Sequence, residues 1–143
     1  MSIWFKDYSL EDINKNNTNT MVDFCDISIT ALNEDSLEGQ MIVSDKIKQP
    51  FGIVHGGANC VLGETLGSVA ANLTCDPQKN HAVGLSITTN HIRAVRNGTI
   101  KAIAKANHLG RATQVWEIKT FNDAQKLTSI TTLTMSILNR LGN

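Results

Sequence analysis

A long apolar segment near the middle of the chain, residues 58–73, limits the possible folds more than any other part of the sequence. Its apolar residues recur at three- and four-residue spacing, at Leu62, Leu66, Val69, Ala70 and Leu73. This period predicts an α-helix of about four turns, and apolar residues on most of its sides predict that the helix is buried. Gly63 and Gly67 each disfavour such a helix by up to about 1 kcal/mol relative to alanine. We therefore expect them to let a neighbouring stretch of backbone approach the helix closely.

Strand patterns fill most of the remaining sequence. After the helix, β-branched and apolar runs are separated by turn residues, at 82–92, 99–107, 113–121 and 127–138. Before it, we predict a short helix starting at Leu10 and a hairpin formed by 22–32 and 39–44. Trp116 and Ile118 alternate with charged residues, which is typical of an antiparallel sheet with one covered face. These elements predict one α+β domain over residues 1–143, with a sheet wrapped around the central helix.

The charge balance excludes two classes of binding protein. The chain has 13 basic and 13 acidic residues and a formal net charge of +0 at pH 7. A general nucleic-acid binder, or a protein that binds anionic membranes, needs a basic excess. The charges are unevenly distributed, because residues 1–76 hold 11 acids and 4 bases, whereas residues 77–143 hold 2 acids and 9 bases. The basic half indicates either a phosphate-bearing ligand or a solvated face balanced by the acidic half.

Several common functions lack their sequence motifs. Three cysteines without C-x-x-C spacing argue against a disulfide framework and a thiolate zinc site, and they favour a reducing, cytoplasmic compartment. The histidines lack metal-ligand spacing, and no Walker A or dinucleotide-binding motif is present. No apolar run approaches the roughly 18 residues of a membrane span. We expect no metal, no nucleotide cofactor and no membrane partner.

Glu64 is the first residue that could carry chemistry. It lies within the most apolar segment of the chain, and Ser68 and Asn72 follow it at four-residue spacing. The three side chains therefore form one polar stripe along the predicted helix. Glu64 lies either in a partly desolvated cleft or on the wet stripe of a half-exposed helix, and both interpretations remain open at this point.

The string His55-Gly56-Gly57 is the second such feature, because it immediately precedes the helix. Glycines leave backbone amides uncovered, and the N–H groups at a helix N-terminus favour developing negative charge. An oxyanion site needs donors of this kind. A glycine-rich turn required by a sharp entry into the helix is the alternative. The string does not indicate an α/β-hydrolase, because no G-x-S-x-G motif is present.

The segments around both features closely resemble the hotdog-fold acyl-CoA thioesterases. They are QPFGIVHGGA at 49–58 and GETLGS at 63–68, supported by 83–93 and 108–116. The resemblance covers residues 24–138. The subgroup that the chain resembles is that of the PaaI-like 4-hydroxybenzoyl-CoA, 1,4-dihydroxy-2-naphthoyl-CoA and enterobactin-proofreading thioesterases. It implies a curled antiparallel sheet around a long helix. It also implies hydrolysis of an acyl-CoA, with aryl or hydroxyaryl acyl groups suggested by the subgroup.

The resemblance implies catalytic roles residue by residue. Glu64 matches the carboxylate that acts as nucleophile on the thioester or as general base for water. Gly56 matches the residue whose backbone N–H polarises the thioester carbonyl, and His55 and Gln49 match flanking positions that assist there. Ser68 matches a hydroxyl residue that orients the attacking water.

The remaining implications concern binding and assembly. His91, Arg93 and Arg96 fall where the family handles coenzyme A, which is part of the substrate and not a cofactor. A carrier-protein thioester is an alternative substrate, because both carriers share the pantetheine arm. The family forms homodimers that share each active site between two subunits and pair into homotetramers.

The sequence departs from the family pattern at two positions. Asn59 and Gly63 stand where Ser and Ala are commoner. A hotdog hydratase or dehydratase, or a non-catalytic acyl-CoA binding module, are the alternative functions.

Overall fold

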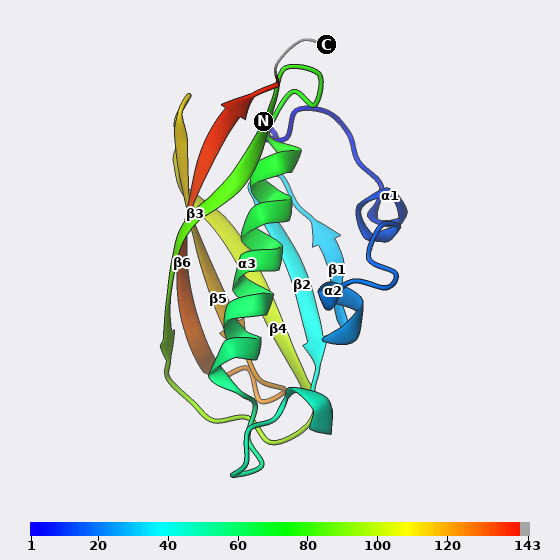
Figure 1. Ribbon diagram of the computed structural model, residues 1–143, viewed down its shortest axis with the longest axis vertical. Coiled ribbons are helices and arrows are strands. Elements are labelled where there is room, and N and C mark those ends of the chain that lie inside the picture. The colour runs from blue at the N-terminus through cyan, green and yellow to red at the C-terminus, as the bar shows by residue number, and fades with distance from the viewer. Residues whose placement is uncertain (141–143) are drawn as a thin grey trace.

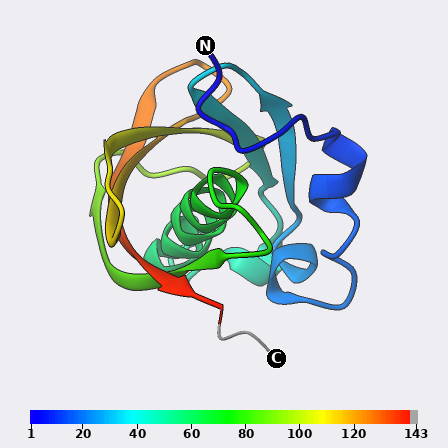
Figure 2. The same ribbon diagram turned by 90° about the horizontal axis from the view of Figure 1, so that it is seen from above.

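A six-stranded antiparallel sheet curls around one long helix in the computed structural model, which describes residues 1–140 (Figures 1 and 2). The strand order is β1-β2-β4-β5-β6-β3. The strands are β1 Ile27–Leu32, β2 Ser36–Ile42, β3 Asn80–His91, β4 Thr99–Leu109, β5 Thr113–Phe121 and β6 Leu127–Asn139. The helices are α1 Leu10–Asn14, α2 Met21–Phe24 and α3 Gly56–Leu73, with a 3-10 turn at Asp45–Ile47. This is the α+β hotdog arrangement that the sequence predicted.

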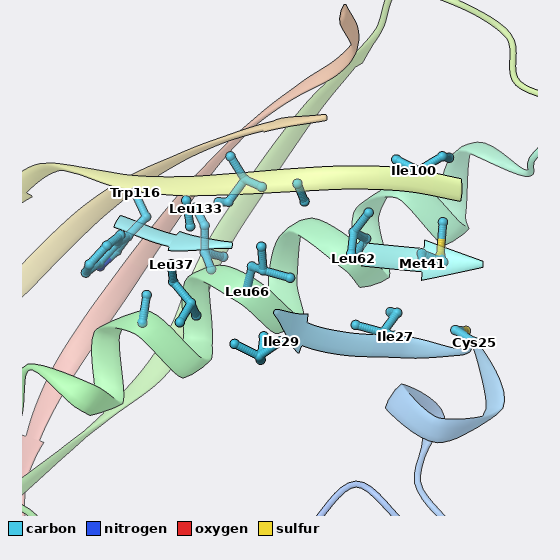
Figure 3. Packing of buried hydrophobic residues seen from close by; sticks show 14 of the residues in the cluster. Cys25, Ile27, Ile29, Leu37, Met41, Leu62, Leu66, Ile100, Trp116 and Leu133 are labelled. Atoms are coloured by element: carbon cyan, nitrogen blue, oxygen red, sulfur yellow. The ribbon is translucent and has the colours of Figure 1, made fainter. Parts of the chain in front are cut away.

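The core lies between α3 and the concave face of the sheet. Leu62 and Leu66 of α3 are fully buried between the helix and the sheet (Figure 3), and Leu66 lies against Gly39 of β2. Full burial of a leucine side chain stabilises a fold by about 1.5–3 kcal/mol relative to an exposed one. Close packing explains the helical glycines, because a Cβ at Gly63 would lie 2.8 Å from the Thr131 side chain, and one at Gly67 would overlap Leu133. Both glycines therefore let α3 pack tightly against β6, although side chains and not the predicted backbone approach them.

The predicted first hairpin is partly wrong. Residues 21–24 form the short helix α2, β1 starts only at Ile27, and β2 spans Ser36–Ile42 and not 39–44. The β-branched and aromatic residues of 22–25 match strand propensity, but Met21 and Phe24 are exposed and gain no sheet partner. The helix α3 begins two residues earlier than predicted, at Gly56. The last four predicted strands are confirmed, with bounds that differ by a few residues at most.

Strand β3 forms one free edge of the sheet, since it pairs only with β6 (Figure 1). Its side chains are unusually exposed for a long strand: Leu85 has an exposed fraction of 64%, and Val83 and Ile87 also face solvent. Long apolar edge strands are templates for pairing with another chain. The helices α1 and α2 lie beyond β1 at the opposite edge (Figure 2). No helix among residues 1–140 has the length and apolar character needed to cross a membrane.

Candidate active site

The N-terminus of α3 presents an unused backbone donor. His55 is the N-cap residue, with extended backbone angles, and its Nδ1 accepts a hydrogen bond from the Gly57 N–H at 2.8 Å. The backbone N–H of His55 donates to the carbonyl of Ile47 at 2.9 Å, which anchors the entry to the helix. The Gly56 N–H has no acceptor within residues 1–140. A free N–H at the positive end of an 18-residue helix is suited to bind a carbonyl oxygen that is becoming negative.

A pocket of about 260 Å³ opens in front of this amide. Its polar lining consists of Gln49, Gly56, Asn59, His91 and Arg93. The structure thus brings together two of the predicted catalytic residues and two of the predicted coenzyme A residues. The Gln49 side chain is turned toward its own loop, where Oε1 accepts a hydrogen bond from the Phe51 N–H.

Glu64 lies at a second position along the same helix. Its side chain is half-buried, and the Ser68 hydroxyl donates to Glu64 Oε1 at 3.2 Å. The backbone of β3 passes directly beside it, because a Cβ at Gly84 would lie only 2.5 Å from Oε1. Asn72 continues the stripe and exchanges two hydrogen bonds with the backbone of Ala82, at 2.9 and 3.0 Å. The predicted polar stripe therefore lies against the free edge strand, and Glu64 is half-buried there.

A larger pocket, of about 510 Å³, lies between Ser68, the hydrogen-bond partner of Glu64, and the N-terminal segment. Its walls are Ser68, Val69, Asn72 and Leu73 of α3 and residues from Lys6 to Lys15. Burial raises the pKa of the Tyr8 hydroxyl in this wall above its ordinary value.

The two halves of the predicted site are separated within one chain. Gly56 and Glu64 are eight residues apart on α3, which corresponds to about 12 Å along the helix axis. A reacting carbonyl must lie within about 3–3.5 Å of both its nucleophile and its hydrogen-bond donor. One chain by itself does not bring these two groups to the same carbonyl.

Arg93 and Arg96 lie in the loop between β3 and β4 and are exposed. Arg96 Nη1 donates to the Phe51 carbonyl at 3.3 Å, which ties this loop to the loop that carries Gln49. Neither arginine forms an ion pair with a carboxylate in the described part of the chain. Within residues 1–140, no three His, Cys, Asp or Glu side chains are grouped to hold a metal ion.

Sequence reasoning missed two contacts of this region. The close approach of Gly84 to Glu64 had a weak signal in the sequence, since an isolated glycine within a strand often marks a place where another part of the chain comes close. The hydrogen-bond contact between Asn59 Nδ2 and His91 Nδ1, at 3.2 Å, joins residues 32 positions apart and had none.

Comparison with known proteins agrees with this architecture. A family model described as the thioesterase superfamily matches residues 51–129. The chain is 41% identical over 136 residues to the 1,4-dihydroxy-2-naphthoyl-CoA hydrolase of Escherichia coli K12, covering 95% of this chain and 99% of that protein. A solved thioesterase from Haemophilus influenzae superposes with a TM-score of 0.94 at 39% identity, covering 99% of this chain and 98% of the other. A mutant thioesterase from Pseudomonas aeruginosa gives 0.95 at 39% identity, covering 97% and 100%.

The curled sheet around a central helix defines the class as a hotdog-fold protein. Within that class, the chain belongs to the thioesterase superfamily, and it is a thioester hydrolase. The family, the fold and the enzyme class predicted from the sequence are confirmed.

Proposed function

We propose that this protein hydrolyses coenzyme A thioesters of aryl or hydroxyaryl acids, with Glu64 and the Gly56 amide as the reacting groups. The observation that carries the proposal is the half-buried Glu64 carboxylate, held by Ser68 on the helix whose N-terminus offers the free amide. The Escherichia coli relative acts on an aryl-CoA of this kind. The basic residues Arg93 and Arg96, which lack carboxylate partners in the described chain, are available for the phosphates of coenzyme A.

The chemistry needs few groups because a thioester carbonyl is already activated. The carbonyl oxygen accepts a hydrogen bond from the Gly56 N–H, which stabilises the negative charge that develops on it. Glu64 either attacks the carbonyl carbon, forming an anhydride that water then hydrolyses, or removes a proton from a water molecule that Ser68 orients. In both routes the C–S bond breaks, coenzyme A leaves as a thiol after gaining a proton, and water supplies the oxygen of the free acid.

Two subunits complete each site in this proposal. The separation of Gly56 from Glu64 within one chain requires a second chain, and the apolar free edge of β3 supplies a surface for it. Gly84 lies beside Glu64, and the His91 ring lies against Gly56 at the other end of β3. If two β3 strands pair antiparallel about an axis near Ile87, Gly84 of one subunit lies opposite His91 of the other. Glu64 then approaches Gly56 of the partner subunit. Such dimers pair into tetramers, and three cysteines without disulfides suit a reducing, cytoplasmic compartment.

Release of free thiol from a panel of thioesters tests the reaction. The panel contains 1,4-dihydroxy-2-naphthoyl-CoA, 4-hydroxybenzoyl-CoA, fatty acyl-CoA and a carrier-protein thioester, with a chromogenic disulfide reagent as the readout. We expect the highest kcat/KM with the aryl-CoA substrates, and a loss of about 10²–10⁴-fold in kcat for Glu64→Gln with unchanged circular dichroism. Wild-type turnover by this variant would overturn the proposal. A hydratase, a dehydratase or a binding module would release no thiol.

Complementation between two inactive variants tests the shared site. Glu64→Gln and Gly56→Pro each remove one half, so a mixed dimer holds one doubly altered and one intact site. Random assembly after co-expression should restore about a quarter of wild-type activity. No recovery in mixed dimers, verified by two affinity tags, would show that each site is built within one chain.

A further inference from the structure

The pocket at the N-terminus of α3 contains a buried amide that nothing in the proposed reaction uses. Asn59 has an exposed fraction of only 7%, and it lies one turn after Gly56. Its Nδ2 is 3.2 Å from His91 Nδ1, and its Oδ1 has no hydrogen-bond partner within the described chain. A buried asparagine with half of its polar atoms unpaired is costly to stability. Its contact with His91 is therefore the feature to explain.

This contact determines which ring nitrogen of a neutral His91 carries the proton. The Asn59 Nδ2 group has only hydrogens to offer, so the nitrogen facing it, Nδ1, must be the acceptor. The proton of the neutral ring then lies on Nε2. A histidine whose one nitrogen is held by a neighbour presents the other nitrogen in a defined state and direction.

The protonated nitrogen lies next to the unused backbone amide. His91 Nε2 is 2.9 Å from the position that a Cβ of Gly56 would occupy. That position is about 2.5 Å from the Gly56 backbone nitrogen, so the two nitrogens are separated by at most about 5.4 Å. Two N–H···O bonds of ordinary length span up to about 5.8 Å. A single oxygen atom can therefore accept hydrogen bonds from both groups.

We propose that the His91 Nε2–H is a second donor to the thioester carbonyl oxygen, and that Asn59 is the residue that positions it. The inference rests on the proposed thioesterase reaction and assigns His91 to the carbonyl, whereas the family resemblance assigned it to coenzyme A. His91 keeps its proton throughout and contributes a hydrogen bond that strengthens as the oxygen becomes negative. Asn59 never touches the substrate, and its effect passes through the imidazole ring.

The tautomer can be read directly without any activity measurement. Long-range ¹H–¹⁵N spectra of the wild-type protein at a pH where the ring is neutral distinguish the two tautomers, and the chain has only 4 histidines to assign. We expect His91 with its proton on Nε2. We expect Asn59→Asp to move the proton to Nδ1, because a carboxylate only accepts hydrogen bonds. A wild-type His91 with its proton on Nδ1 would overturn the proposal, even if every variant failed to fold.

Kinetics separate a donor to the carbonyl from a residue that binds coenzyme A. Asn59→Leu and His91→Leu should each lower kcat about 100-fold and leave KM within about twofold, because the lost interaction forms only in the transition state. His91→Gln retains an N–H donor and should recover part of that loss. The matched control is His108→Gln, at the far end of β4, which should leave both constants unchanged.

Two results would overturn the assignment: a raised KM with unchanged kcat in the His91 variants, or an Asn59→Leu variant with wild-type kcat. Failure of the underlying reaction gives a different pattern, in which Glu64→Gln retains turnover while the His91 tautomer is still the expected one.

Discussion

Replacement of Gly56 by proline tests the backbone donor at the helix N-terminus, a group that ordinary side-chain substitutions do not reach. Proline has no N–H and is favoured at the first position of a helix, which is where Gly56 lies. The residue before a proline must be extended, and His55 already has φ −61° and ψ 134°. The Gly56 N–H forms no hydrogen bond within residues 1–140, so its removal takes none from the fold.

Gly56→Ala is the matched control, because it adds the same Cβ and retains the N–H. In both variants this carbon meets the His91 ring, with Nε2 2.9 Å away, so any displacement of the ring is shared. The difference between the two variants therefore isolates the amide. Loss of one donor to a developing oxyanion lowers kcat by about 10²–10³-fold, equivalent to about 3–4 kcal/mol of transition-state stabilisation. We therefore expect the kcat of Gly56→Pro to be lower than that of Gly56→Ala by this factor, with a smaller effect on KM.

The assay is thiol release from the best aryl-CoA substrate, together with the melting temperature and oligomeric state of both variants. Equal melting temperatures, within about 2 °C, would confirm that the helix start is intact. If proline and alanine differed by less than about threefold in kcat while both remained folded, the Gly56 amide would have no part in stabilising the carbonyl oxygen.

Three further predictions concern other contacts of the site and core. Gly84→Ala places a Cβ 2.5 Å from Glu64 Oε1 and should displace the carboxylate. We expect kcat to fall at least tenfold with little change in melting temperature. A wild-type kcat would mean that the close approach of Gly84 does not position Glu64. Gly67→Ala forces a methyl group into the Leu133 side chain. We expect the free energy of unfolding, measured by urea denaturation, to fall by about 1–3 kcal/mol. A more stable variant would show that the helix preference of alanine outweighs the overlap with Leu133. Arg93→Ala should raise the KM for acyl-CoA at low salt. The difference in KM between the variant and the wild type should shrink toward 1 M salt, because exposed charges are screened there. A salt-independent difference would indicate a role of Arg93 other than phosphate binding.

Local sequence patterns determined the central helix and the sheet that follows it. The apolar spacing of α3 and the alternation around Trp116 both express which side of an element must be buried, and burial drives folding whatever the neighbour is. The same patterns failed at Met21–Phe24, where strand-like residues form a helix because no sheet neighbour receives them. The motif residues around Gly56 and Glu64 could be identified from the sequence, since their family pattern is local.

Only the tertiary structure decided how these residues meet. Asn59 contacts His91 across 32 positions, and Gly84 lies beside Glu64, because the curled sheet brings β3 along one side of α3. The separation of Gly56 from Glu64 follows from the rise of one helix, so the two groups lie about two turns apart along α3. Contacts between distant segments depend on strand order and sheet curvature, which no local residue pattern encodes. The sequence by itself therefore predicted which groups carry the chemistry, and chain folding decided which of them share a pocket.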